Sequence, residues 1–147
     1  MTRFALTLAP ANTSRVLRRD QRRAAVFAVY QNDVTGNPVS QLLPEDSTPF
    51  TRELAEAASL QAEDCDAVID AHAHGWDVTR IAPLERAILR VALVEMTEPE
   101  RFDSISPIAP EGAIDEAVET TKQYCGTDAP GFVNGILGAV LEERRAA

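Results

Sequence analysis

The segment from Pro83 to Met96 restricts the fold more than any other part of the chain. It reads PLERAILRVALVEM, and its apolar residues cover most of the circumference of a helix. Proline is well tolerated in the first turn of a helix, so Pro83 suits the start of this one. A helix that is apolar on nearly all sides is a buried helix. We therefore expect a central core helix from residue 83 to about 97.

The rest of the chain also has helical periodicity, and no segment alternates as a strand does. We expect further helices at about 14–32, from after Thr48 or Thr51 to Leu60, and at 62–72, 111–124 and 128–145. The helix that ends at Leu60 should bury that leucine. Glycine and proline residues interrupt the pattern at 33–50 and 98–110. The sequence thus predicts an all-α protein of about six to seven helices, and 147 residues favour one domain.

The net charge of −9 is unevenly distributed along the chain. Residues 1–23 carry six arginines and one aspartate, a net +5, whereas the remainder carries 8 basic and 22 acidic residues, a net −14. An acidic total argues against a protein that coats nucleic acid by charge alone. The basic end of the chain nevertheless remains a candidate for a local contact with nucleic acid.

The basic residues of the first helix gather on one face. Within about 140° on a helical projection lie Arg15, Arg18, Arg19, Arg22 and Arg23. Tyr30 lies on the same row as Arg19 and Arg23. Guanidinium groups can hold phosphates while a tyrosine stacks on an unpaired base, which suits single-stranded RNA. Alternatively, the arginines form a solvated face and Tyr30 belongs to the core. In both cases we expect the arginine half of the helix to project into solvent.

No pattern in the sequence indicates catalysis. Phosphate-binding loops, nucleophile elbows and zinc-binding spacings are absent. Cys65 and Cys125 lie 60 positions apart, which fits a reduced cytoplasmic protein better than a disulfide scaffold. We expect a cytoplasmic protein that is not an enzyme, holds no cofactor or metal and does not cross a membrane.

Four segments together resemble the NusB family of transcription antitermination factors. They are RRDQRRAAVFAVYQNDVTG (18–36), GWDVTRIAPLERAILRVALVEM (75–96), IDEAVETTKQY (114–124) and GFVNGILGAVLEE (131–143). The resemblance implies one compact helical domain over residues 14–147, with packed sub-bundles at about 14–74 and 76–147. Residues 1–13 extend beyond the family's usual core, and we expect them to form a flexible tail.

The resemblance also implies a function. NusB family members bind boxA, a short single-stranded RNA element, together with the small ribosomal protein NusE, which then contacts RNA polymerase. The complex promotes antitermination during rRNA transcription, and neither DNA nor a membrane is a partner. Carried over to this chain, the RNA-binding residues are Arg18, Arg19, Arg22, Arg23, Tyr30 and Phe132.

Three residues of the C-terminal half have alternative interpretations. Phe132 either contacts RNA or belongs to the apolar arc of the last helix. Asp128 matches a position near the family's RNA surface, but its residue type and place also suit the N-cap of that helix. Glu85 matches a partner-binding position, and a glutamate in a first turn also complements the helix dipole.

The chain departs from the family pattern at three positions. Glu111 and Gly112 stand where the family often has lysine and valine, and Val94 stands where an aromatic residue is common. Glu111 places negative charge near the expected RNA path and could weaken RNA affinity. The alternative function is therefore a helical protein-interaction module, or a homodimer, with weak or lost RNA binding.

Overall fold

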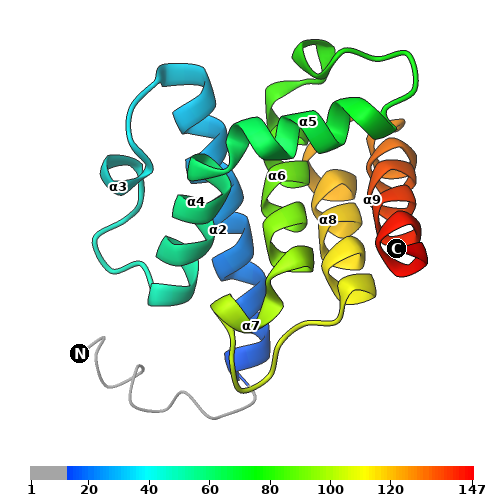
Figure 1. The fold of residues 1–147 in the computed structure, drawn as a ribbon. Helices are drawn as coiled ribbons and strands as arrows, with labels where there is room; N and C mark the ends of the chain where they lie inside the picture. Colours follow the sequence, from blue (N-terminus) through cyan, green and yellow to red (C-terminus); the bar gives the residue numbers. More distant parts are fainter. Residues whose placement is uncertain (1–12) are drawn as a thin grey trace.

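The computed structural model describes residues 13–147, and in this range all regular structure is helical (Figure 1). The α-helices are α2 (Thr13–Thr35), α3 (Val39–Leu42), α4 (Pro49–Leu60), α5 (Ala62–His72), α6 (Pro83–Thr97), α7 (Pro99–Phe102), α8 (Pro110–Tyr124) and α9 (Ala129–Ala146), with a 3-10 turn η1 (Val78–Arg80) before α6. The all-α prediction is confirmed. The six longer helices correspond to the expected ones, and the one-turn helices α3 and α7 bring the number to eight in the described range. The predicted flexible tail lies outside the described residues, apart from Thr13.

Helix α6 is the centre of the molecule. It runs between α2 and α8 (Figure 1) and also packs against α4, α5 and α9. Every residue from Ala87 to Met96 is buried. Burying a large apolar side chain such as Ile88 or Leu89 contributes about 1.5–3 kcal/mol to folding. The expected central core helix is thus confirmed, and it begins at Pro83 as predicted.

The start of α4 was predictable, but the burial of its last residue was not. Thr48 is the N-cap, because its side-chain oxygen accepts a hydrogen bond from the Thr51 amide at 3.2 Å. Leu60 is 83% exposed, so the expected burial of this side chain is wrong. Leu60 follows Ala57 at helical spacing, but α4 ends at Leu60 and the chain turns into α5. None of the helices between residues 13 and 147 covers the side chain at that corner.

Buried ion pairs join α6 to the helices on either side of it. The Arg90 guanidinium, 6% exposed as a residue, donates to both Asp66 carboxylate oxygens at 2.8 and 2.7 Å. It also lies 3.4 Å from Asp33 of α2. Arg86 donates to Asp33 as well. Arg86 and Arg90, one helical turn apart, therefore fix both α2 and α5 to α6.

The surroundings of the first turn of α8 bear on two of the departures from the family pattern. A Cβ atom at Gly112 would lie 2.9 Å from Cγ1 of Ile108, so a larger residue there would require the Ile108 side chain to shift. Glu111 forms an ion pair with Arg145 of α9, and that hydrogen bond lowers the pKa of the Glu111 carboxyl. The charge of Glu111 is thus compensated within the chain.

The helices share one core rather than two. A single cluster of buried side chains extends from α2 and α4 through α6 to α8 and α9. The division into two sub-bundles stays a prediction. None of the helices between residues 13 and 147 has the combination of length and apolarity that a bilayer crossing requires.

Candidate nucleic-acid interface

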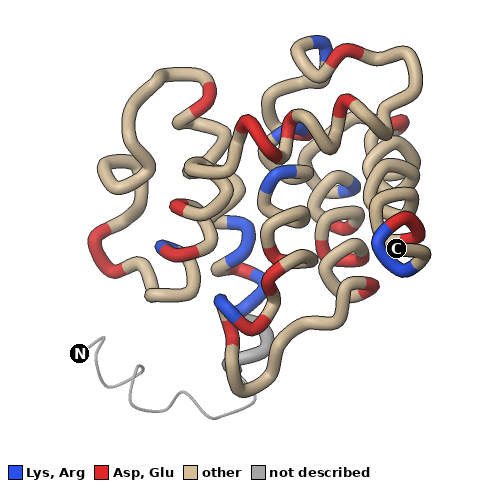
Figure 2. Tube along the Cα trace, viewed as in Figure 1, with Lys and Arg blue, Asp and Glu red and all other residues tan. Residues whose placement is uncertain are grey.

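Three arginines of α2 are paired with carboxylates from other elements. Arg18 lies 3.1 Å from Asp103, and Arg19 donates two hydrogen bonds to Glu116 of α8 at 3.0 and 2.9 Å. Figure 2 shows the basic positions of α2 beside acidic positions of its neighbours. On this face Arg18, Arg19 and Arg22 therefore each have a local counter-charge. The side chain of Arg15 lies outside the described residues.

Arg22 forms the third pair, and this pair is largely buried. Its guanidinium donates to both oxygens of Glu95 at distances of 2.8–3.0 Å. The Arg22 and Glu95 side chains are only 16% and 4% exposed. The expectation that the arginine half of the helix projects into solvent is wrong at this position. The reason is that α2 packs along α6, which presents a carboxylate to Arg22.

Arg19 is the most exposed of the three, with 49% of its side chain accessible. The hydrogen bond with Glu116 raises the pKa of the Arg19 guanidinium, so this group is charged at every physiological pH. Exposed ion pairs of this kind are worth about 0.2–1 kcal/mol. A phosphate group could therefore replace Glu116 at little cost.

Arg23 and Tyr30 lie on one row of α2, as predicted, but their surroundings differ from each other. The Arg23 guanidinium lies 5.9 Å from the ring centre of Tyr124 of α8. Its Nε atom is buried and has no hydrogen-bond partner in the described part of the chain. Tyr30 packs against the core and keeps part of its surface exposed. This position fits the core interpretation of Tyr30 and still leaves an accessible edge.

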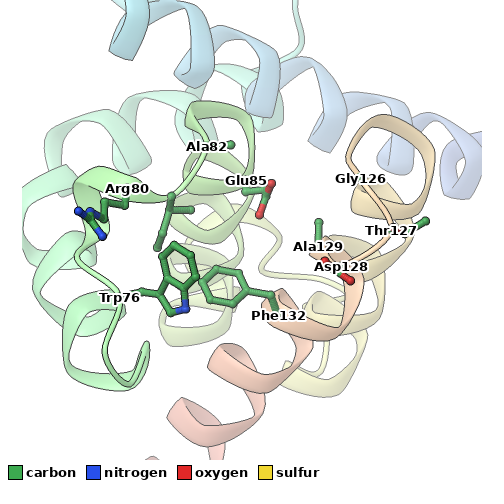
Figure 3. A pocket seen from close by; sticks show the side chains of 10 residues that line it. Trp76, Arg80, Ala82, Glu85, Gly126, Thr127, Asp128, Ala129 and Phe132 are labelled. Atoms are coloured by element: carbon green, nitrogen blue, oxygen red, sulfur yellow. The ribbon is translucent and has the colours of Figure 1, made fainter.

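A cavity of about 630 Å³ lies between the η1 turn, the start of α6 and the loop that joins α8 to α9. Figure 3 shows its lining side chains, which are Trp76, Arg80, Ile81, Ala82, Glu85, Gly126, Thr127, Asp128, Ala129 and Phe132. Glu85, Asp128 and Phe132 were selected separately from the sequence, and the fold brings all three to this one cavity. It thus lies next to a predicted partner residue and two residues predicted near RNA.

The three predicted residues play distinguishable parts in the cavity. Partial burial raises the pKa of the Glu85 carboxyl, which indicates an incompletely solvated anion. Phe132 packs against the core and also lines the cavity, so its two interpretations are compatible. Asp128 occupies the N-cap position of α9, but its side chain makes no capping hydrogen bond. An incoming hydrogen-bond donor or cation would find two carboxylates here.

Two aromatic residues near these sites were missed in the sequence analysis. Trp76 is 54% exposed and lines the cavity together with Phe132. Tyr124 is 43% exposed and makes a T-shaped contact with Phe27, with ring centres 5.1 Å apart. Each stands next to a segment end marked by glycine, and that location could have signalled an exposed aromatic ring. Within the described residues, no cluster of histidine, cysteine or acidic side chains is arranged to hold a metal ion.

Residues 19–142 match the sequence model of the NusB family. The chain belongs to the NusB family. The matched range includes every predicted site residue except Arg18, and it spans the cavity as well. The resemblance of the four quoted segments is thereby confirmed.

Named relatives are similar over most of their length. The transcription antitermination protein NusB of Rubrobacter xylanophilus is 36% identical over 126 residues, which are 82% of this chain and 86% of the relative. The transcription antitermination protein NusB of Salinibacter ruber is 33% identical over 134 residues, covering 84% of this chain and 80% of the relative.

Solved NusB structures share the fold. T. maritima NusB superimposes with a TM-score of 0.72 at 24% identity, covering 86% of this chain and 91% of that one. A crystal structure of the antitermination factors NusB and NusE in complex with dsRNA gives a TM-score of 0.70 at 23% identity. The match covers 86% of this chain and 96% of that one. The helical architecture described above is thus the NusB fold.

Proposed function

We propose that this chain is a transcription antitermination factor that binds boxA-like single-stranded RNA together with the small ribosomal protein NusE. Its relatives carry the name of antitermination proteins, and a chain of the same fold was crystallised with NusE and dsRNA. The observation that supports RNA binding most directly is the exposed guanidinium of Arg19. It lies on the same helical row as Arg23 and is held only by a surface ion pair.

In this proposal the arginines of α2 have two different roles, phosphate binding and the positioning of α2. Arg18 and Arg19 bind phosphates, because their own side chains are 33% and 49% exposed and can reach a strand without leaving the protein surface. Arg22 holds α2 against α6 and positions the others. Tyr30 and Phe132 supply partly exposed aromatic surface for unpaired bases.

Glu85 is the proposed contact to NusE. Its carboxyl is partly desolvated and faces a cavity large enough to admit a side chain of another protein. A cationic or hydrogen-bonding group of the partner would compensate that charge. We infer a binding protein rather than an enzyme, working in the cytoplasm where NusE and RNA polymerase are found.

The RNA assignment is tested with two variants of the same ion pair. Arg19→Gln removes a phosphate contact and should lower the affinity for boxA-like RNA about three- to tenfold. The affinity should also depend less steeply on salt concentration. Glu116→Gln releases Arg19 and should strengthen binding by up to about fivefold, since an exposed pair is worth at most about 1 kcal/mol. Fluorescence anisotropy with labelled RNA measures both effects.

Arg144→Gln is the control, because Arg144 is an exposed arginine near the end of α9. Its affinity for RNA should equal that of the wild type. An Arg19→Gln variant that binds like this control would refute the arginine assignment.

A second candidate function is a protein-interaction module with weak or lost RNA binding. It is favoured by the ion pairs that Arg18, Arg19 and Arg22 already form with carboxylates of the same chain. This candidate predicts no RNA binding at low salt even when NusE is present. A homodimer that covers the arginine face is a variant of it, and sedimentation measurements would detect the dimer.

A further inference from the structure

We propose that Tyr124 is a stacking residue for an RNA base, placed between the arginines of α2 and the cavity that contains Phe132. The inference rests on the proposed RNA-binding function and deepens it by defining the path of the strand. It concerns a residue at the end of α8 that neither the sequence pattern nor the ion pairs single out.

The ring of Tyr124 is both accessible and fixed in orientation. It is 43% exposed, although tyrosine is a large and largely apolar side chain. Phe27 of α2 meets it nearly at right angles, at 88°, with 5.1 Å between the ring centres. A perpendicular contact leaves part of the π-surface uncovered, and the support from Phe27 reduces the entropy lost when a base stacks.

Arg23 supplies a cation next to this ring. Its guanidinium carbon lies 5.9 Å from the ring centre, at the outer limit of a cation–π contact. The Arg23 Nε donor has no acceptor within the described residues. A buried donor without an acceptor costs free energy, so the side chain gains by turning toward a phosphate oxygen. An aromatic ring beside such an arginine suits a nucleotide, whose base and phosphate use both groups.

The position of Tyr124 connects the two candidate sites. Eight residues before it on α8 lies Glu116, the partner of Arg19, at a rise of about 12 Å along the helix. Two and four residues after it, Gly126 and Asp128 line the cavity together with Phe132. A single strand that touches Arg19 and Phe132 along this side of α8 therefore passes Tyr124.

Stacking on tyrosine depends on the π-face of the base and little on its identity. Tyr124→Leu should therefore lower the affinity for boxA-like RNA about tenfold, whereas Tyr124→Phe should bind this RNA as tightly as the wild type does. The dependence of affinity on salt should stay unchanged in both variants, because no charge is removed. Thermal unfolding of each full-length variant shows whether loss of the Phe27 contact has altered the fold.

Crosslinking provides a measurement that does not depend on a variant. RNA that carries 4-thiouridine should crosslink to the peptide of the wild-type chain that contains Tyr124. Absence of this crosslink, or wild-type affinity in Tyr124→Leu while Arg19→Gln is weakened, overturns the inference and leaves the RNA function standing. Weakened NusE binding by Tyr124→Leu with normal RNA binding would instead make Tyr124 a protein contact. If the wild type binds no RNA, both proposals fail.

Discussion

At the scale of single residues, the arginines of α2 show that the same residue type serves two purposes on one helix face. The Arg22–Glu95 pair is almost completely buried, so its charges depend on each other for solvation. The Arg19–Glu116 pair is half exposed on the arginine side, and water can replace either partner. The first pair therefore belongs to the fold, and the second is available to a ligand.

This difference makes a stability prediction for Arg22. Arg22→Ala leaves the carboxylate of Glu95 buried without a counter-charge and should destabilise the chain by about 3–5 kcal/mol. The double variant Arg22→Met/Glu95→Leu removes both charges and should recover most of that loss. Urea unfolding of the three proteins gives the comparison. A double variant that is as unstable as Arg22→Ala would show that the pair is not the cause.

The burial of Arg22 could not have been predicted from the local sequence. The helical projection placed Arg22 on the arginine face correctly, but Glu95 lies 73 positions away on α6. The cavity escaped prediction for a similar reason, because its lining comes from two segments, one near Trp76 and Glu85 and one from Gly126 to Phe132. Residue types and spacings identify candidate side chains, whereas tertiary packing decides which of them meet.

At the scale of helices, the predictable features are those that depend on neighbours in sequence. The apolar circumference of α6 and Pro83 at its start were sufficient to place this helix. Thr48 with Pro49, and Asp77 before η1, likewise have local signals for the elements they begin. The burial of Leu60 was predicted wrongly because the apolar spacing continues to the last residue of α4, where the side chain is exposed.

Two leucines test this account of the helices. Leu89 of α6 is 0% exposed, so Leu89→Ala removes buried surface and leaves a cavity, at a cost of about 2–5 kcal/mol. Leu60→Ala makes the same chemical change at a residue that is 83% exposed, and it should alter stability by no more than about 0.5 kcal/mol. Chemical denaturation measures both values. Similar losses in the two variants would contradict the assignment of α6 as the core helix.

At the scale of the whole molecule, the location of the charged residues decides where RNA can bind, and the net charge alone does not. The net charge of −9 suggests a protein that repels nucleic acid, yet several arginines gather on one helix, α2, where acidic positions lie beside them (Figure 2). The carboxylates of Asp103, Glu95 and Glu116 lower the positive potential of that face. We therefore expect modest RNA affinity for the isolated chain and a larger contribution from the bound partner.

The central claim is that this chain binds boxA-like RNA jointly with NusE through two adjoining surfaces. The most direct measurement is a titration of labelled boxA-like RNA with the full chain, in the presence and absence of NusE, at low and moderate salt. The Glu85→Lys variant reverses the desolvated charge in the cavity and serves as the comparison. The account predicts salt-sensitive binding by the wild type that NusE strengthens. It further predicts that Glu85→Lys keeps most of its own RNA affinity and loses the strengthening by NusE. No RNA binding by the wild type at low salt, even with NusE present, would contradict the account.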